Sequence, residues 1–193
     1  MHQQLINYIN SHSTLPLTST EEALAKAAFK PKKLKKKEYF LQEGEVCKYS
    51  AFIVKGAMRQ YSIDEKGIEH VIYLYIENYW ASDRESMIML TPSVFNIDAW
   101  EDTEILVITR AEMADLMSKI PAIVEMIRLM DERNAIANQR RLNSTIRSTA
   151  ERRYEEFARD YPQFIQRFPQ YLIASFLGIT QESLSRIRKN SNR

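Results

Sequence analysis

The sequence has 193 residues, of which 45% are hydrophobic and 27% charged, and its formal net charge at pH 7 is +2, values typical of a folded protein with one large or two small domains. No apolar run approaches the roughly 18 residues of a membrane-spanning helix, and residues 1–13 lack the features of a secretory signal, so we expect a cytoplasmic protein. The single cysteine, Cys47, excludes internal disulfides, four-cysteine iron–sulfur clusters and thiolate zinc sites, and three histidines are too few for a histidine-rich metal site.

Two short helices are predicted at the N-terminal end. Residues 2–12 place Leu5, Ile6 and Ile9 on one side of an amphipathic helix. A second helix begins near Thr18, because Thr18 and Glu21 have the spacing of a capping box.

From about residue 34 to residue 109 the sequence changes to short β-rich runs such as YSAFIVKG, AMRQYSI, EHVIYLYI and EILVIT. Turn signals separate these runs, with Gly44, Gly56 and Gly67 at or near the bends. Regular short strands with turns between them predict an antiparallel β-roll, and the helices around it place the chain in the α+β class.

A run of six lysines leads into the first strand: Lys30, Lys32, Lys33, Lys35, Lys36 and Lys37. Such a run can bind nucleic acid or a membrane surface. We favour the polar side of an edge strand, because no aromatic residues alternate with the lysines and because charge blunts an exposed sheet edge.

A short helix over residues 111–120 is followed by a long one from Pro121 to about Arg147, where no proline or glycine interrupts the pattern. Mostly apolar residues recur here at alternating spacings of four and three: Leu116, Ile120, Ile123, Ile127, Met130, Asn134 and Ala137. This stripe predicts a homodimer whose seam contains the last five of these residues, with Asn134 as a polar position that fixes the register. The alternative is that the stripe packs on the protein's own β-roll.

The C-terminal third of the chain is basic. Residues 140–193 contain eleven Lys and Arg against five Asp and Glu, whereas residues 1–139 carry a net charge of −4. Ten of the eleven are arginines, whose planar fork of donors suits phosphate and guanine. We therefore expect double-stranded DNA as a partner.

Residues 170–189, after one more predicted helix over 149–169, have the spacing of a helix-turn-helix. Gly178 supplies the positive φ of a tight turn, and Thr180 is the predicted N-cap of the second helix. Leu184 and Ile187 form the apolar side of that helix. Its other side carries residue types that pair with bases and phosphates: Gln181, Glu182, Ser185, Arg186 and Lys189. The alternative is a helical hairpin whose polar side simply faces water.

In this order the elements resemble the Crp/Fnr family of transcription regulators. The resemblance rests on the EGE turn at 43–45, the strand and turn at 52–56, the strand at 101–108, the long helix, and residues 170–189. It implies a sensor roll similar to cyclic-nucleotide-binding domains in residues 1–120, a dimerisation helix over 121–147, and a DNA-binding domain over 148–193. It also implies a non-enzymatic homodimer that binds a two-fold operator and works with RNA polymerase.

By the same resemblance, Gln181, Glu182 and Arg186 occupy the positions that contact bases. Arg186 would bind guanine, Glu182 cytosine, and Gln181 adenine or a phosphate. Candidates for contact with the DNA backbone are Thr180, Ser183, Ser185, Arg188 and Lys189. Because the chain ends a few residues after Lys189, we expect no β-hairpin wing after the second helix.

The sequence departs from the members that bind cyclic AMP, which carry a Gly-Glu pair for the ribose and an Arg-Ser or Arg-Thr pair for the phosphate. Ala81 and Ser82 stand roughly at the first pair, and Pro92 and Ser93 at the second. Without a buried cation the phosphate would lose its hydration uncompensated, so we expect no cyclic AMP, and the missing ligands argue against haem and iron–sulfur clusters. A pocket for a different, unidentified effector would involve Trp80, Ser82, Arg84 and Glu85.

Two other classes of protein are alternatives to a regulator. A metal-dependent β-barrel enzyme needs a cluster of His and Glu ligands, and His70 is the only histidine in the β-rich region. A ligand-binding regulatory module that acts through protein partners, without sequence-specific DNA binding, stays open as the alternative function.

Overall fold

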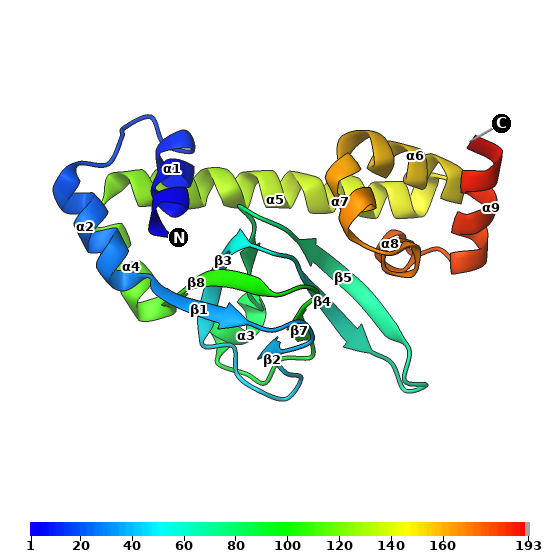
Figure 1. The fold of residues 1–193 in the computed structure, drawn as a ribbon, viewed down its shortest axis with the longest axis horizontal. Helices are drawn as coiled ribbons and strands as arrows, with labels where there is room; N and C mark the ends of the chain where they lie inside the picture. The colour runs from blue at the N-terminus through cyan, green and yellow to red at the C-terminus, as the bar shows by residue number, and fades with distance from the viewer. Residues whose placement is uncertain (192–193) are drawn as a thin grey trace.

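A long helix, α5 (Pro121–Arg147), runs along the molecule and connects its parts in the computed structural model, which describes residues 1–191 (Figure 1). At one end lie α1 (His2–Ser11), α2 (Ser19–Ala28) and α4 (Arg110–Lys119). Beside the middle of α5 lie the strands with α3 (Arg84–Met89), and at the other end α6 (Ala150–Asp160), α7 (Pro162–Arg167), α8 (Gln170–Leu177) and α9 (Gln181–Ser191).

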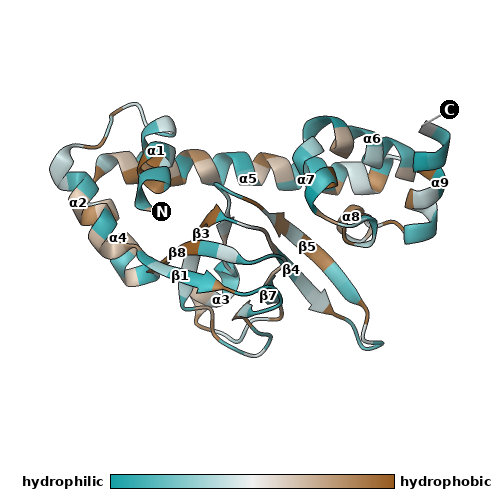
Figure 2. Cartoon of the chain, in the orientation of Figure 1, coloured by the Kyte–Doolittle hydropathy of each residue, from teal (hydrophilic) through white to brown (hydrophobic). Residues whose placement is uncertain are grey.

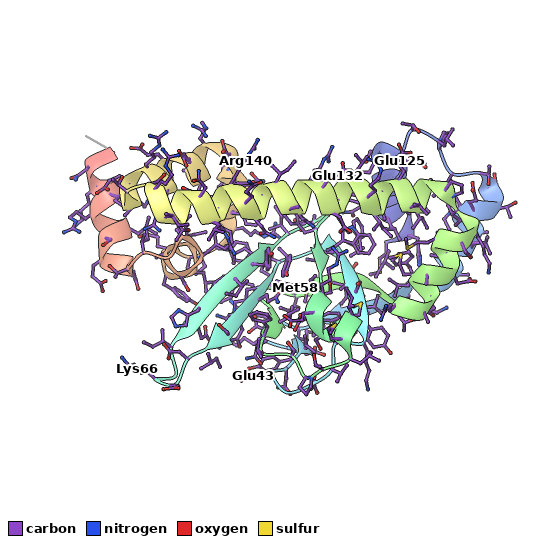
Figure 3. All side chains as sticks on the ribbon, turned by 180° about the vertical axis from the view of Figure 1, so that it is seen from behind. Glu43, Met58, Lys66, Glu125, Glu132 and Arg140 are labelled. Atoms are coloured by element: carbon purple, nitrogen blue, oxygen red, sulfur yellow. The ribbon has the colours of Figure 1, made fainter. Side chains whose placement is uncertain are left out.

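The strands form two four-stranded antiparallel sheets, which confirms the predicted roll. The first sheet has the order β1 (Lys30–Leu34), β8 (Thr103–Thr109), β3 (Tyr49–Lys55), β6 (Trp80–Ala81). The second has the order β2 (Tyr39–Leu41), β7 (Asn96–Ala99), β4 (Met58–Ile63), β5 (Glu69–Tyr75). Figure 3 places Met58 among the strands and Lys66 at the tip of the β4–β5 hairpin.

The lysine run belongs to an edge, as predicted. β1 is the edge strand of the first sheet, and Lys30, Lys32 and Lys33 on it are exposed. The Nζ of Lys33 lies 2.8 Å from Glu104 on the neighbouring strand, and the ammonium of Lys36 lies over the ring of Trp100. Charge and Pro31 together discourage pairing with another chain at this edge.

Alternation along β3 shows how the sheets separate the cores. Ala51 and Ile53 point into the roll, where they pack with residues of both sheets, and Phe52 between them points to the helices. The helix-facing cluster contains residues of α1, α4 and the start of α5. Figure 2 shows hydrophobic residues on the strands and on α5 beside α1, whereas α9 is largely hydrophilic. Within residues 1–191, no helix is long and apolar enough to cross a membrane.

The N-terminal part of the dimer seam predicted on α5 is wrong, because its residues pack inside the protein itself. Ile123 is 1% exposed, because it belongs to the protein's own core beside α1 and α4, and Ile127 packs against the same cluster. These two residues therefore face the chain's own helices and sheet. Met130 is half-buried, and Asn134 and Ala137 are exposed. Apolar spacing alone does not distinguish a partner helix from the protein's own roll.

Candidate nucleic-acid interface

Residues 170–189, for which a helix-turn-helix is predicted, contain two helices, α8 and α9, joined by a short turn. Gly178 ends α8 with φ at 64°, and the backbone N–H of Ile179 donates to the carbonyl of Ala174 at 3.0 Å. The hydroxyl of Thr180 accepts from the backbone N–H of Ser183 at 3.1 Å, so Thr180 caps α9 as predicted. The turn and the cap together fix where the second helix begins.

One side of α9 is buried against the neighbouring helices, and the opposite side is exposed. Leu184 and Ile187 are buried in a cluster with Ala174 and Leu177 of α8 and with residues of α6. The proposed base-contacting residues lie together on the exposed side: Gln181, Glu182 and Arg186. The backbone N–H of Glu182 itself and the Thr180 hydroxyl lower the pKa of the Glu182 carboxyl, so it is ionised at neutral pH and suited to accept from a base amino group.

The candidates for contact with the DNA backbone divide into two groups. Lys189 and Thr180 are exposed, although the Thr180 hydroxyl already interacts with Ser183. Ser183, Ser185 and Arg188 are half-buried, and Arg188 lines a small hollow with Tyr154 and other residues of the domain core. The structure thus leaves Lys189 with more freedom to reach a phosphate than Arg188 has.

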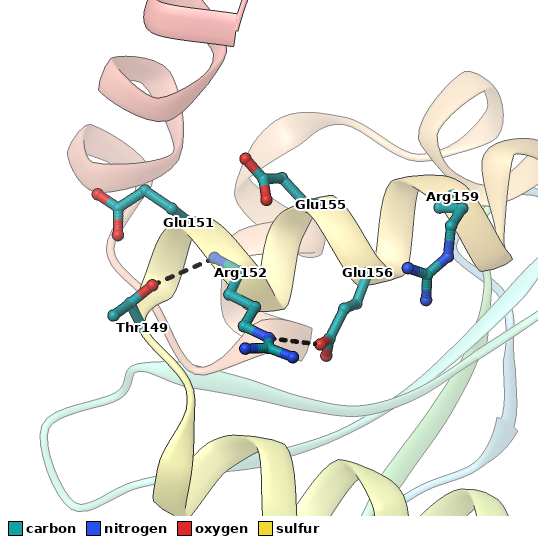
Figure 4. Close-up of a pocket in the computed structure, with 6 residues that line it drawn as sticks. All are labelled: Thr149, Glu151, Arg152, Glu155, Glu156 and Arg159. Atoms are coloured by element: carbon teal, nitrogen blue, oxygen red, sulfur yellow. Dashed lines mark hydrogen bonds and ion pairs between the residues drawn. The ribbon is translucent and has the colours of Figure 1, made fainter.

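The exposed side of α6 is hollowed but carries mixed charge (Figure 4). Thr149 caps the helix by accepting from the backbone N–H of Arg152, and the Nε of Arg152 donates to Glu156 at 2.9 Å. The remaining residues along it are Glu151, Glu155 and Arg159. Three carboxylates beside two guanidinium groups do not give the uniform positive charge that a phosphate backbone requires.

The residues proposed for an effector pocket do not form one group. Strand alternation turns Trp80 to the helix side of its sheet, where it packs against Tyr8, Phe29 and Phe52, whereas Ala81 points into the roll. Trp80 therefore does not line a pocket with the other three, and its assignment is corrected. Among the other three residues, Ser82 is half-buried and Glu85 is exposed. The guanidinium of Arg84 donates to both carboxylate oxygens of Asp131 on α5, at 2.5 and 2.7 Å.

Sequence analysis missed Asp83, whose carboxylate is buried at the start of α3. One oxygen accepts from the backbone N–H groups of Glu85 and Ser86, and the other accepts from the Ser93 hydroxyl at 2.7 Å. The Asp83 carboxylate thus joins the start of α3 to the segment that follows this helix. An Asp immediately before a short helical run was the available signal, because Asp is a preferred N-cap. Within residues 1–191, no three His, Cys, Asp or Glu side chains are placed to hold a metal ion.

Comparison with known proteins defines the class of the roll and then the fold of the chain. Residues 31–120 match the cyclic nucleotide-binding domain family. FixK2 of Bradyrhizobium japonicum shares the fold with a TM-score of 0.72 and 16% identity, over 84% of this chain and 83% of FixK2. The c-di-GMP-responsive regulator CLP of Xanthomonas campestris gives 0.72 and 11%, over 91% and 92%.

A putative Crp/Fnr-family regulator of Eubacterium rectale aligns with a TM-score of 0.65 and 15% identity, over 90% of this chain and 83% of that protein. No curated protein matches the sequence. The chain therefore combines a roll of the cyclic-nucleotide-binding type with the fold of Crp/Fnr regulators.

Proposed function

We propose that the protein is a DNA-binding transcription regulator of the Crp/Fnr type, which acts as a homodimer on a two-fold operator. The observation that carries this proposal is α9: its exposed side presents Gln181, Glu182 and Arg186, and its apolar side is seated on α8 and α6. A polar helix face on a rigid apolar seat is what entry into a major groove requires. The shared fold with bacterial regulators supports the same function.

Dimerisation is proposed to use a side of α5 different from the one that Ile123 occupies. Leu142 and Ile146, near the C-terminal end of α5, are 63% and 75% exposed. Together with Ala135 and Gln139 they continue a spacing of four and three on the side of the helix opposite the core. Exposed large aliphatic residues at this spacing favour a second copy of α5 as their partner.

Replacing Arg186 by alanine is expected to weaken binding to a selected operator by about 1–3 kcal/mol and to relax the preference at one base pair, because a bidentate contact with guanine is lost. The measurement is selection from random DNA followed by titration of the enriched sequence with wild-type and variant protein. Arg110→Ala is the matched control, since Arg110 is an exposed arginine on α4 outside the DNA-binding domain.

Two results would contradict this assignment. An Arg186→Ala protein that keeps its full sequence preference would show that Arg186 does not contact a base. Wild-type protein that enriches no motif would favour the regulatory module acting through protein partners. The same titration checks the dimer, because a two-fold operator should bind two chains.

The roll is proposed to have lost the binding of cyclic AMP. By the resemblance, Pro92 and Ser93 stand roughly at the pair whose arginine would bind the phosphate. The Ser93 hydroxyl donates to the buried Asp83 carboxylate, and a second anion beside Asp83 would be repelled. Arg84, the one arginine of this loop, is already paired with Asp131. Any effector of the roll is therefore of a different chemistry, and we expect neither haem nor an iron–sulfur cluster.

Calorimetric titration of the protein with cyclic AMP is expected to show no binding at micromolar concentration. The physical reason is that the phosphate would exchange its hydration for a site that offers a carboxylate in place of a cation. Heat from a saturable, one-to-one interaction in this concentration range would refute the expectation.

A further inference from the structure

The DNA-binding domain of this protein is packed on its own roll and does not simply extend from the end of α5. The outer face of the second sheet contributes Tyr61, Val71 and Leu74, and the turn before β4 contributes Ala57, to the same hydrophobic cluster as α6, α7, α8 and α9. Aromatic contacts cross the boundary: Tyr79 meets Phe164 and Trp100 meets Tyr171, with ring centroids 5.5 and 6.2 Å apart. The two parts therefore share one core.

Helices α8 and α5 cover β5, the edge strand of the second sheet. β5 is the last strand in the order of the second sheet, and its register with β4 shifts between Gln60 and Tyr61. The backbone N–H of Val71 donates to the Ser175 hydroxyl of α8 at 2.9 Å, and that hydroxyl donates to the carbonyl of Glu69 at 3.3 Å. On α5, Arg141 donates to the carbonyl of Ile72 at 2.6 Å. Backbone groups that an edge strand leaves unpaired are thus satisfied by the C-terminal part of the chain.

An arginine clamp fastens the same boundary. Arg167, at the end of α7, binds Glu101 in the β7–β8 turn through Nε and Nη2, at 2.6 and 2.8 Å, and binds Glu77 after β5 at 3.0 Å. Glu77 also accepts from the backbone N–H of Gly56 at 2.8 Å. Burial raises the pKa of the Glu77 carboxyl, but hydrogen bonds from Arg167 and from backbone N–H groups outweigh burial and lower it, so Glu77 is charged at neutral pH.

We propose that Arg167 is a positioning residue that locks the helix-turn-helix to the roll and thereby makes the protein selective for the spacing between operator half-sites. This inference rests on the proposed function. Each inserted base pair rotates one half-site by about 35° around the DNA axis, since a helical turn contains 10–10.5 base pairs. A domain tethered only through Ser148 and Thr149 could follow that rotation. A domain fixed to the roll by Arg167 and Ser175 cannot.

The docking itself is tested by amide exchange on the full-length protein, with Val71 as the reporter. Arg167→Ala and the double variant Glu77→Gln/Glu101→Gln, which keeps the size of both side chains, are expected to accelerate exchange at Val71 by about tenfold or more, because the hydrogen bond to Ser175 opens more often. Arg167→Lys should give a smaller increase, since an ammonium cannot form the two-carboxylate fork. Arg159→Ala, an exposed arginine of the same domain, should leave Val71 unchanged. Unchanged exchange at Val71 in both clamp variants would show that Arg167 does not hold the C-terminal helices on the roll.

Spacing selectivity is tested on the operator selected by the wild-type protein, with one or two base pairs inserted between its half-sites. Wild-type affinity is expected to fall about tenfold or more, and the clamp variants should lose only about threefold while keeping the same half-site sequence. Equal losses in wild-type and clamp variants would overturn the role of Arg167 in spacing and leave the proposed function intact. If the wild-type protein enriched no operator at all, the proposed function would fail together with the spacing role, and exchange at Val71 would still decide whether the domain is locked.

Discussion

Replacing Arg59 by methionine is expected to lower the free energy of unfolding by about 3–5 kcal/mol, because it leaves a buried carboxylate without its partner. The side chains of Arg59 on β4 and Asp98 on β7 are only 9% and 7% exposed. Two parallel hydrogen bonds join them, Nε to Oδ1 at 2.9 Å and Nη2 to Oδ2 at 3.0 Å, and Arg59 also binds Glu69. Its guanidinium lies 4.1 Å from the ring centroid of Tyr61, beneath the docked C-terminal domain.

Equilibrium unfolding in urea, with Arg59→Met beside Arg128→Met, measures this effect. Arg128 is an exposed arginine of α5 that pairs with Glu132 one turn away, so its loss should cost about 0.5 kcal/mol or less. The double variant Arg59→Met/Asp98→Leu should recover much of the stability, since it removes the unpaired charge and fills the same space. If the double variant were as unstable as Arg59→Met alone, the cost would lie in packing and not in the stranded carboxylate.

The features that sequence analysis predicted correctly are those set by neighbouring residues. Thr18 and Glu21 form a capping box because both hydrogen bonds lie within four residues, and Gly178 and Thr180 end one helix and begin the next for the same reason. The alternation of β3 and the turns around it likewise determine which side chains point into the roll. Local hydrogen bonding and side-chain period were therefore enough to predict the roll, the long helix, and the end of α8 and start of α9.

The features that sequence analysis missed depend on partners distant in the chain. Arg167 meets Glu101 and Glu77 from 66 and 90 residues away, and nothing in the local sequence distinguishes Arg167 from the solvated arginines near it. Ile123 has the spacing of a dimer seam, but the same spacing suits any apolar neighbour, and α1 and α4 supply it. Trp80 was misplaced because a two-residue strand gives no alternation from which to predict its direction.

Replacing Gly56 by alanine is expected to lower the free energy of unfolding by about 2–6 kcal/mol, since backbone strain and overpacking both contribute. Gly56 connects β3 and β4 with φ at 103°, a conformation that L side chains rarely adopt. A Cβ at this position would lie 2.7 Å from the Cα of Thr103 and 2.8 Å from the carbonyl oxygen of Asp102. These are backbone atoms at the end of the β7–β8 turn and the start of β8, so they cannot move aside as the end of a flexible side chain would.

Gly67→Ala separates the two causes, because Gly67 has φ at 79° but nothing within 4 Å of the added Cβ. It should cost only about 1–2 kcal/mol, the strain of a left-handed alanine. A loss at Gly56 no larger than at Gly67, measured by the same urea unfolding, would show that the β7–β8 turn yields. That result would bear on the clamp as well, since the turn that Gly56 touches carries Glu101, and the backbone N–H of Gly56 donates to Glu77. A rigid contact between Gly56 and Thr103 keeps both carboxylates in place for Arg167, so the tight turn supports the position of helices α6 to α9.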